Sequence, residues 1–234
     1  MIIYRPSSAR GRTETGWLDG RHTFSFGAYR DPAWVHFGAL RVINEDVVAP
    51  SGGFPPHDHA DMEIITYVLS GALAHQDSLG NAAMIRPGEI QMMRAGTGIT
   101  HSEFNASKTE PVHLLQIWIM PNARGLAPGY QQRALNTADR ADTWQTVVAP
   151  ANNNISGAFD IATDARLSLA QLAAGKPLAL PAEAGRKYWL QIAKGSVTYG
   201  DQVLSQGDGL GLSGEPARGI TASEDSELLL FDLV

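Results

Sequence analysis

Short runs of mostly apolar residues recur along the whole chain, and turn-forming residues separate them. In the first half these runs are 37–44, 62–69, 89–94, 99–104 and 112–120, and in the second half 144–149, 166–172, 188–193, 196–199 and 227–233. Each run has the length of a β-strand, and clusters of Gly, Pro, Ser and Asn such as 51–53 and 78–81 lie between them. The pattern predicts an all-β chain of many short strands.

Residues 121–143 interrupt this pattern, because Pro121, Gly125, Pro128 and Gly129 are followed by a more polar stretch. We interpret this stretch as a connection that contains a short helical turn. The expected organisation is an N-terminal domain at 1–125, a linker at 126–143 and a C-terminal domain at 144–234.

An approximate internal repeat relates the two halves. Residues 67–73, around Gly71, resemble residues 191–197, around Gly195, and Pro87-Gly88-Glu89 resembles Gln206-Gly207-Asp208. A repeat of this kind predicts two similar β-barrels in tandem, the second with a shorter hairpin.

Composition excludes several classes of site. The 24 Asp and Glu residues outnumber 18 Lys and Arg, so the net charge of −6 disfavours direct binding to nucleic acid. The chain has no cysteine, which excludes disulfides, zinc–thiolate sites, iron–sulfur clusters and thiol catalysis. No apolar stretch approaches the roughly 20 residues of a membrane span, and the first residues lack the apolar segment of a signal peptide. We therefore expect a cytoplasmic protein with no membrane association.

All seven histidines lie within the first 113 residues, which points to a site in the first half only. Two patterns are prominent, His57-Asp58-His59 and His101-Ser102-Glu103. Residues two apart on a strand share a face, so each pattern directs two potential ligands to one side. Three imidazoles and a carboxylate suit a divalent transition metal: iron, manganese, cobalt, nickel, copper or zinc.

Glu63 is in register with His57 and His59 if the strand continues unbroken. It could then be a fifth ligand, a residue that orients an imidazole, or a solvated strand residue. The other histidines, at 22, 36, 75 and 113, are interpreted as structural.

The chain resembles the pirin family of bicupins, and in particular bacterial pirin-like proteins known as quercetin 2,3-dioxygenases. The supporting motifs are His57-x-His59, Glu63-x3-Tyr67-Val68-Leu69-x-Gly71, His75-x-Asp77-Ser78-x-Gly80 and Gly96-Thr97-Gly98-Ile99-x-His101-Ser102-Glu103. The resemblance implies two jelly-roll cupin barrels, with the metal on residues matching His57, His59, His101 and Glu103 and with Glu63 outside the ligand set. The repeat offsets place no histidine in the second barrel, which is expected to be free of metal.

Four protein ligands on an octahedral ion would leave two positions for substrate and dioxygen. The resemblance implies Fe(II) as the metal and a flavonol such as quercetin as the substrate, cleaved with O₂ and release of CO. Glu103 is the candidate for moving the flavonol proton, and Glu63 is a weaker candidate for a general base. Two alternatives remain open at this point: a non-enzymatic, redox-responsive regulatory partner of another protein, as eukaryotic pirins are described, and a metal-dependent isomerase or hydrolase.

Overall fold

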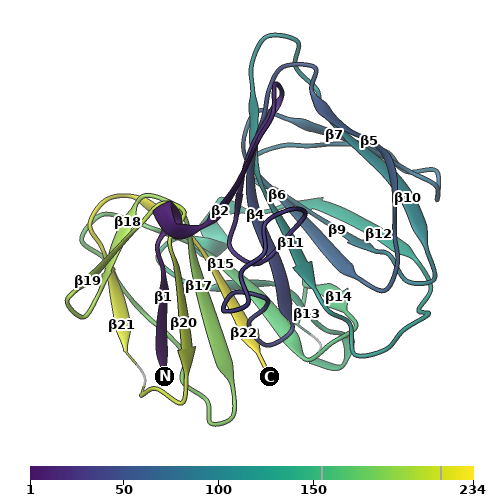
Figure 1. Ribbon diagram of the computed structural model, residues 1–234. Coiled ribbons are helices and arrows are strands. Elements are labelled where there is room, and N and C mark those ends of the chain that lie inside the picture. Colours follow the sequence, from purple (N-terminus) through teal and green to yellow (C-terminus); the bar gives the residue numbers. More distant parts are fainter. Residues whose placement is uncertain (154, 217) are drawn as a thin grey trace. The chain divides into compact units, whose positions relative to one another are not determined.

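The computed structural model describes residues 1–153, 155–216 and 218–234. The chain forms two compact units (Figure 1). Residues Gly11–His36 and Leu40–Leu135 form the first, here called the N-terminal barrel, and Met1–Arg10, Phe37–Ala39 and Asn136–Val234 form the second, the C-terminal barrel.

The N-terminal barrel consists of two antiparallel sheets. The seven-stranded sheet has the order β12-β9-β6-β11-β4-β3-β2 and the four-stranded sheet the order β5-β10-β7-β8. The strands of the larger sheet are β2 (Gly11–Glu14), β3 (Leu18–His22), β4 (Leu40–Val48), β6 (Glu63–Ser70), β9 (Glu89–Arg94), β11 (Val112–Ile119) and β12 (Gly129–Ala134). Those of the smaller sheet are β5 (Gly53–His59), β7 (Leu73–Asp77), β8 (Ala82–Ile85) and β10 (Ile99–Asn105).

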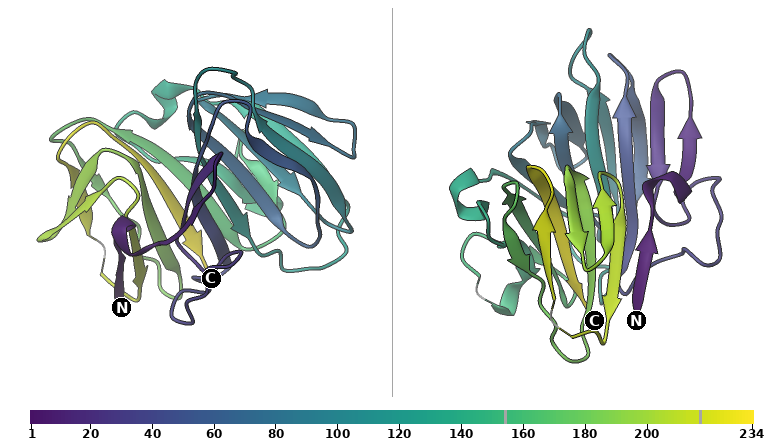
Figure 2. Two further views of the ribbon diagram at one scale, coloured as in Figure 1. Left: turned by 45° about the horizontal axis from the view of Figure 1, so that its top comes forward. Right: turned by 90° about the vertical axis from the view of Figure 1, so that its left-hand side faces the viewer.

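The C-terminal barrel repeats this plan, with sheets ordered β1-β20-β17-β22-β15-β13-β14 and β16-β21-β18-β19. The larger sheet contains β1 (Ile2–Arg5), β13 (Gln145–Pro150), β14 (Phe159–Ile161), β15 (Ala165–Leu172), β17 (Lys187–Lys194), β20 (Gly209–Ser213) and β22 (Ser226–Leu233). The smaller one contains β16 (Pro177–Ala179), β18 (Ser196–Tyr199), β19 (Gln202–Ser205) and β21 (Gly219–Ala222). Strand β1 therefore pairs with β20 of the C-terminal barrel, although the N-terminal barrel comes directly after it in the sequence (Figure 2).

Helical structure is limited to three 3₁₀ turns within the described residues: η1 (Ser7–Ala9), η2 (Thr137–Arg140) and η3 (Ala151–Asn153). Turn η2 lies in the expected linker, and the Asn136 side chain accepts a hydrogen bond from the Ala138 amide at its start. The predicted all-β bicupin architecture with short helical turns is confirmed. In the part of the chain that the structure describes, no helix has the length and apolarity needed to cross a bilayer.

The ten predicted strands all exist, with ends shifted by a few residues at most, but the described residues form twelve others that were not predicted. One of them, β12, occupies residues 129–134 of the expected linker and pairs with β9 of the N-terminal barrel. Its sequence, Gly-Tyr-Gln-Gln-Arg-Ala, has little apolar alternation, so strand pairing rather than side-chain burial determines its conformation. The expected domain boundaries at 125 and 143 stay a prediction about which parts fold independently.

A row of polar residues crosses the inner face of the large sheet in the N-terminal barrel. Strand pairing aligns, from β12 to β3, the residues Gln132, Gln91, Thr66, Gln116, Asn44 and His22. The row lies between two apolar clusters, one that includes Val68 and Leu114 and one that includes Ile64 and Met93. Buried polar side chains need hydrogen-bond partners, and Thr66 and Gln116 find theirs in each other and in Glu103.

Candidate metal centre

Three histidines converge on the edge strand β5 of the small sheet and its neighbour β10. Strands β5 and β10 are antiparallel, and their register places His57 opposite His101 and His59 opposite Ile99. The Nε2 atoms of His57 and His101 are 3.0 Å apart, and one ring nitrogen from each of the three histidines lies within 4.8 Å of the others. Alternation along each strand therefore brings the predicted imidazoles together, as the sequence spacing indicated.

The residues before His57 fix the orientation of its ring. Pro55 and Pro56 have no amide hydrogen to donate, and the β5–β10 pairing shifts register at this point. The free carbonyl of Pro55 accepts a hydrogen bond from His57 Nδ1 at 2.8 Å. Nε2 of the neutral ring is then left unprotonated, which is the state that a metal ligand requires.

Burial keeps two of these imidazoles uncharged. Burial, the larger effect, and the charge of neighbouring histidines together lower the pKa of His101 to about 3 and that of His59 to about 4. His101 is only 2% exposed, and its Nδ1 has no hydrogen-bond partner in the described part of the chain. Neutral imidazoles with converging nitrogens are the donors that a divalent transition ion binds, so the residues fit such an ion.

Glu103 brings a carboxylate to the same strand as His101. It is 3% exposed and belongs to a separate group of potential ligands, with His75 and His101, whose atoms lie within 4.8 Å of one another; His101 is the member that this group shares with the three histidines. Gln116 Nε2 donates to Glu103 Oε2 at 2.8 Å, and the single hydroxyl hydrogen of Thr66 is shared between Gln116 Oε1 at 3.2 Å and Glu103 Oε1 at 3.4 Å. The polar row of the large sheet thus holds the carboxylate that the small sheet presents. Burial is the largest effect on Glu103 and raises its pKa. Nearby His75 and His57 and the hydrogen bonds from Gln116 and Thr66 act in the opposite direction and stabilise the charged carboxylate.

The structure places Glu63 in a different environment from the histidines. The chain turns at Asp61, which has a positive φ of 50°, so Glu63 begins β6 of the large sheet instead of continuing β5. Its carboxylate is fully buried and accepts a hydrogen bond from Arg94 Nε at 2.7 Å. The condition of an unbroken strand, on which its register with His57 and His59 depended, is therefore not met.

His75 is part of this cluster although the sequence reasoning treated it as structural. It is 1% exposed, its Nε2 donates to Asp77 Oδ2 at 3.2 Å, and its ring packs between those of His101 and Tyr130, with centroids 5.4 and 5.0 Å away. The signal that could have identified it is the spacing His75-x-Asp77, the same two-residue pattern as in the two recognised motifs.

A pocket of about 390 Å³ opens onto the site and lies entirely within the N-terminal barrel. His57, His59 and Glu103 line one part of it, and Phe26, Phe54 and Trp118 supply aromatic walls. This volume is in the range of about 300–1,000 Å³ that is typical of small-molecule sites.

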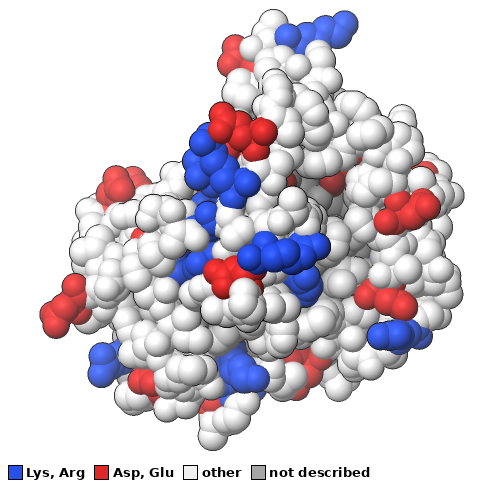
Figure 3. Space-filling model, in the orientation of Figure 1, with Lys and Arg blue, Asp and Glu red and all other residues white. Residues whose placement is uncertain are grey.

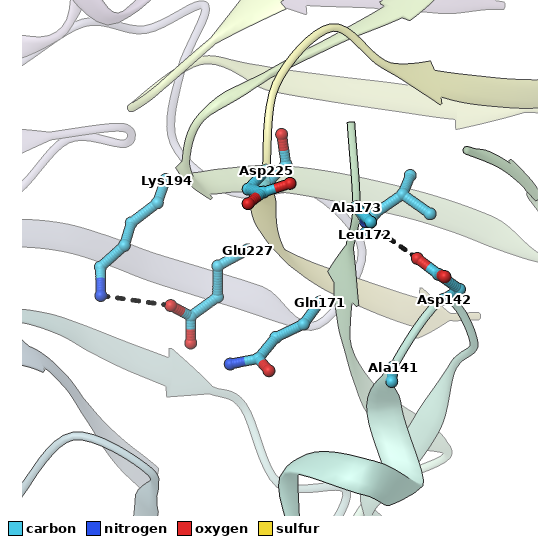
Figure 4. A pocket seen from close by; sticks show the side chains of 9 residues that line it. Ala141, Asp142, Gln171, Leu172, Ala173, Lys194, Asp225 and Glu227 are labelled. Atoms are coloured by element: carbon cyan, nitrogen blue, oxygen red, sulfur yellow. Dashed lines mark hydrogen bonds and ion pairs between the residues drawn. The ribbon is translucent and has the colours of Figure 1, made fainter. Parts of the chain in front are cut away.

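The C-terminal barrel contains a cavity of similar size, about 370 Å³, but with different chemistry (Figure 4). Its charged groups are Asp142, Asp225, Glu227 and Lys194, and the last two form an ion pair at 3.3 Å. It has no histidine, because every histidine of the chain precedes residue 114.

On the face of the molecule drawn in Figure 3, acidic and basic side chains form small neighbouring groups rather than one continuous basic patch.

Comparison with known proteins covers both barrels. The profile of the family Pirin matches residues 4–119, and that of the quercetinase C-terminal cupin domain matches residues 146–233. The quercetin 2,3-dioxygenase of Escherichia coli strain K12 is 46% identical over 233 residues, which span 100% of this chain and 99% of the relative. A pirin-like protein of Caulobacter vibrioides is 41% identical over 232 residues, 99% of each chain.

Solved structures are also similar to this chain over its full length. The crystal structure of YhhW from Escherichia coli has a TM-score of 0.94 and 45% identity, and covers 100% of this chain and 98% of that one. The crystal structure of bacterial pirin YhhW in complex with nickel(II) has a TM-score of 0.93 and 45% identity, with 100% and 99% covered.

Proposed function

Because the chain belongs to the pirin family of bicupins, we propose that it is a metal-dependent quercetin 2,3-dioxygenase. In this reaction a flavonol is cleaved in its heterocyclic ring by O₂, and CO is released. The observation that carries the proposal is the cluster of His57, His59 and His101, whose ring nitrogens converge near the buried carboxylate of Glu103 in the wall of a pocket that also has aromatic walls.

We assign the metal to His57, His59, His101 and Glu103. Three neutral imidazoles and one carboxylate suit Fe(II), which we propose as the physiological metal, and they also suit nickel, the ion in the structure of the Escherichia coli relative. When bound, a divalent ion would supply a Lewis acid with two positions free for substrate and dioxygen. A single carboxylate leaves such a centre with a net charge of +1, which favours an anionic ligand.

Glu103 is the group that we assign to proton transfer. Burial raises its pKa, so it is a better proton acceptor than an exposed carboxylate, and it lies in the pocket where the 3-hydroxyl of a flavonol would be placed. Gln116 and Thr66 fix its two oxygens, so the proton is received at a defined position. Glu63 faces Arg94 and does not line the pocket, and we assign it a structural role instead of the general-base role.

The aromatic walls have a separate task. The Trp118 ring packs edge to face against two rings, with centroid distances of 4.9 Å to His59 and 5.4 Å to Phe26. The centroids of the Phe54 and His57 rings are 6.3 Å apart. Flat apolar surfaces of this kind bind an aromatic substrate and exclude water from the reacting oxygens.

The test is direct. Protein loaded separately with Fe(II), Ni(II) or no metal is incubated with quercetin in air, and the loss of the visible flavonol absorbance is followed together with CO release and bound metal by mass spectrometry. We expect turnover only with metal, and a loss of at least about 10³-fold in His57→Ala and Glu103→Ala. The control is His113→Ala, which removes a histidine that contacts Glu45 and does not line the pocket. Stoichiometric metal without turnover would overturn the proposal and favour the regulatory-partner alternative.

A further inference from the structure

The pocket has a second polar wall, formed by strands β2, β3 and β4 of the large sheet. His22 Nδ1 donates to Asn44 Oδ1 at 2.8 Å, since an amide oxygen can only accept. The other nitrogen of the neutral ring, Nε2, then accepts the hydrogen of Thr13 Oγ1 at 2.8 Å. The Thr13 hydroxyl has thereby used its only hydrogen and offers a ligand nothing but lone pairs.

Asp46 adds a carboxylate to the same wall. It lines the pocket, is only 4% exposed, and lies on β4 two residues beyond Asn44, so both side chains point to the inner face. Gly20, its partner on β3, leaves the space that the carboxylate occupies, because a Cβ there would be 2.7 Å from Asp46 Oδ1. The Asp46 carboxylate and the Thr13 hydroxyl, whose hydrogen is already donated to His22, can both only accept hydrogen bonds from a ligand. This wall is therefore an acceptor surface.

An unbroken series of rings connects this acceptor wall to the histidine cluster. His59 contacts Trp118, Trp118 contacts Phe26, and the Phe26 ring lies 5.4 Å from that of His22. Gln116, which holds Glu103, pairs with Asn44 on the neighbouring strand. One strand spacing and two residues of rise then separate the backbones of Gln116 and Asp46 by about 8 Å. A bicyclic or tricyclic aromatic molecule can therefore contact both ends of the pocket at once.

On the basis of the proposed flavonol oxygenase activity, we propose that Asp46 and Thr13 form a hydroxyl-recognition subsite that accepts hydrogen bonds from the dihydroxyphenyl ring of the substrate. Vicinal phenolic hydroxyls supply two donors on one edge of a flat ring, which matches two acceptors on one wall. The two ends of the pocket then select opposite chemistry: anionic oxygen at the histidines and neutral O–H donors at Asp46. The same carboxylate opposes ligands that carry a carboxylate or phosphate at that end.

The experiment compares three 3-hydroxyflavones that carry two, one or no hydroxyl on the pendant ring: quercetin, kaempferol and galangin. Values of kcat/KM are measured for the metal-loaded wild type, for Asp46→Asn and for Thr13→Val, which come from different strands. The matched control is Glu45→Gln, next to Asp46 in sequence but in contact with His113 instead of the pocket. Circular dichroism and bound metal are recorded for every protein.

We expect the wild type and Glu45→Gln to prefer quercetin over galangin by about 10- to 100-fold, the range for hydrogen bonds to a charged acceptor. The preference should shrink to within about threefold in Asp46→Asn and by a smaller factor in Thr13→Val. Equal kcat/KM values for the three flavonols in the wild type, or an unchanged preference in a folded, metal-loaded Asp46→Asn, would overturn the subsite and leave the proposed function standing. Absence of turnover with all three would instead overturn the proposed function, and the subsite with it.

Discussion

The two barrels share one strand plan but differ in the row of residues at the middle of the large sheet. In the N-terminal barrel the row from β12 to β3 is Gln132, Gln91, Thr66, Gln116, Asn44 and His22. In the C-terminal barrel the corresponding positions, from β1 to β13, are Tyr4, Leu210, Leu190, Leu230, Ser168 and Thr146. The repeat relation found in the sequence, which places Gly71 with Gly195, also places Thr66 with Leu190.

This difference shows how one architecture serves two purposes. The three central leucines of the C-terminal row belong to a continuous buried cluster, so the middle of this sheet packs in an apolar core. In the N-terminal row, Thr66 and Gln116 hydrogen-bond to Glu103, and Gln116 also lines the pocket. The N-terminal barrel thus accepts buried polar groups where its counterpart has apolar packing, and the histidine cluster lies beside them.

The largest expected effect comes from giving the C-terminal barrel one residue of the polar row. Leu190→Thr, which copies Thr66, removes a fully buried side chain and introduces a hydroxyl among leucines. We expect a loss of about 3–5 kcal/mol in the free energy of unfolding, because a cavity and an unsatisfied hydroxyl add together. Urea unfolding followed by circular dichroism measures this. Unchanged stability would mean that the leucine row is dispensable for the C-terminal core.

Acid should affect the N-terminal barrel first, because only that barrel contains histidines. The folded-state pKa values of His101 and His59, about 3 and about 4, lie below the unfolded value of 6.5. The unfolded chain therefore binds protons that the folded chain refuses, and the metal-free protein should lose stability as the pH falls from about 6.5 towards 3. Thermal unfolding of metal-free protein between pH 8 and pH 4 measures the slope. The double variant His59→Ala/His101→Ala should show a shallower slope, and an equal slope would contradict the assignment.

Replacing one member of the polar row by its apolar counterpart should separate stability from metal binding. Gln116→Leu copies Leu230 and removes the 2.8 Å hydrogen bond to Glu103. We expect metal affinity to fall by about 10- to 100-fold, as is typical when a residue that orients a ligand is lost, with little change in unfolding free energy. Competition with a chelator measures the affinity.

Gln91→Leu is the matched control for that experiment. Gln91 is in the same row and 1% exposed, but its Oε1 has no hydrogen-bond partner in the described part of the chain. We expect unchanged metal affinity for this variant. An equal loss in both variants would show that the row acts through general packing.

The smallest effect on catalysis is expected for Glu63→Gln. Loss of the carboxylate that faces Arg94 should lower the unfolding free energy by about 1–3 kcal/mol, since Arg94 is partly exposed and water can replace part of the interaction. Turnover per bound metal should stay within about threefold of wild type. A loss of 10²-fold or more in kcat, with metal retained, would restore Glu63 as a candidate general base.

The sequence predicted the features that depend on local spacing. His57 with His59, and His101 with Glu103, lie two apart on single strands, so alternation alone places each pair on one face. Glu63 shows the limit of predicting a shared face from spacing alone. Glu63 has the right spacing, but the turn at Asp61 transfers it to another sheet, and a turn at a non-glycine residue leaves little trace in composition.

Other features depended on pairings between distant segments. The polar row is visible only when the registers of six strands are known, because its members are separated by tens of residues and each looks like an ordinary strand residue. Strands such as β12 are short or polar and have no hydrophobic face to reveal them. Long-range pairing, rather than local propensity, defines these elements.

The place of β1 has a consequence for how the protein is made. Residues 2–5 are synthesised long before their hydrogen-bonding partners at 209–212, because the whole N-terminal barrel lies between them in the sequence. Throughout synthesis of the N-terminal barrel this segment has no strand to pair with, and it is available to other chains as a strand edge. A deletion within residues 2–5 should therefore damage the C-terminal barrel, to whose large sheet β1 belongs.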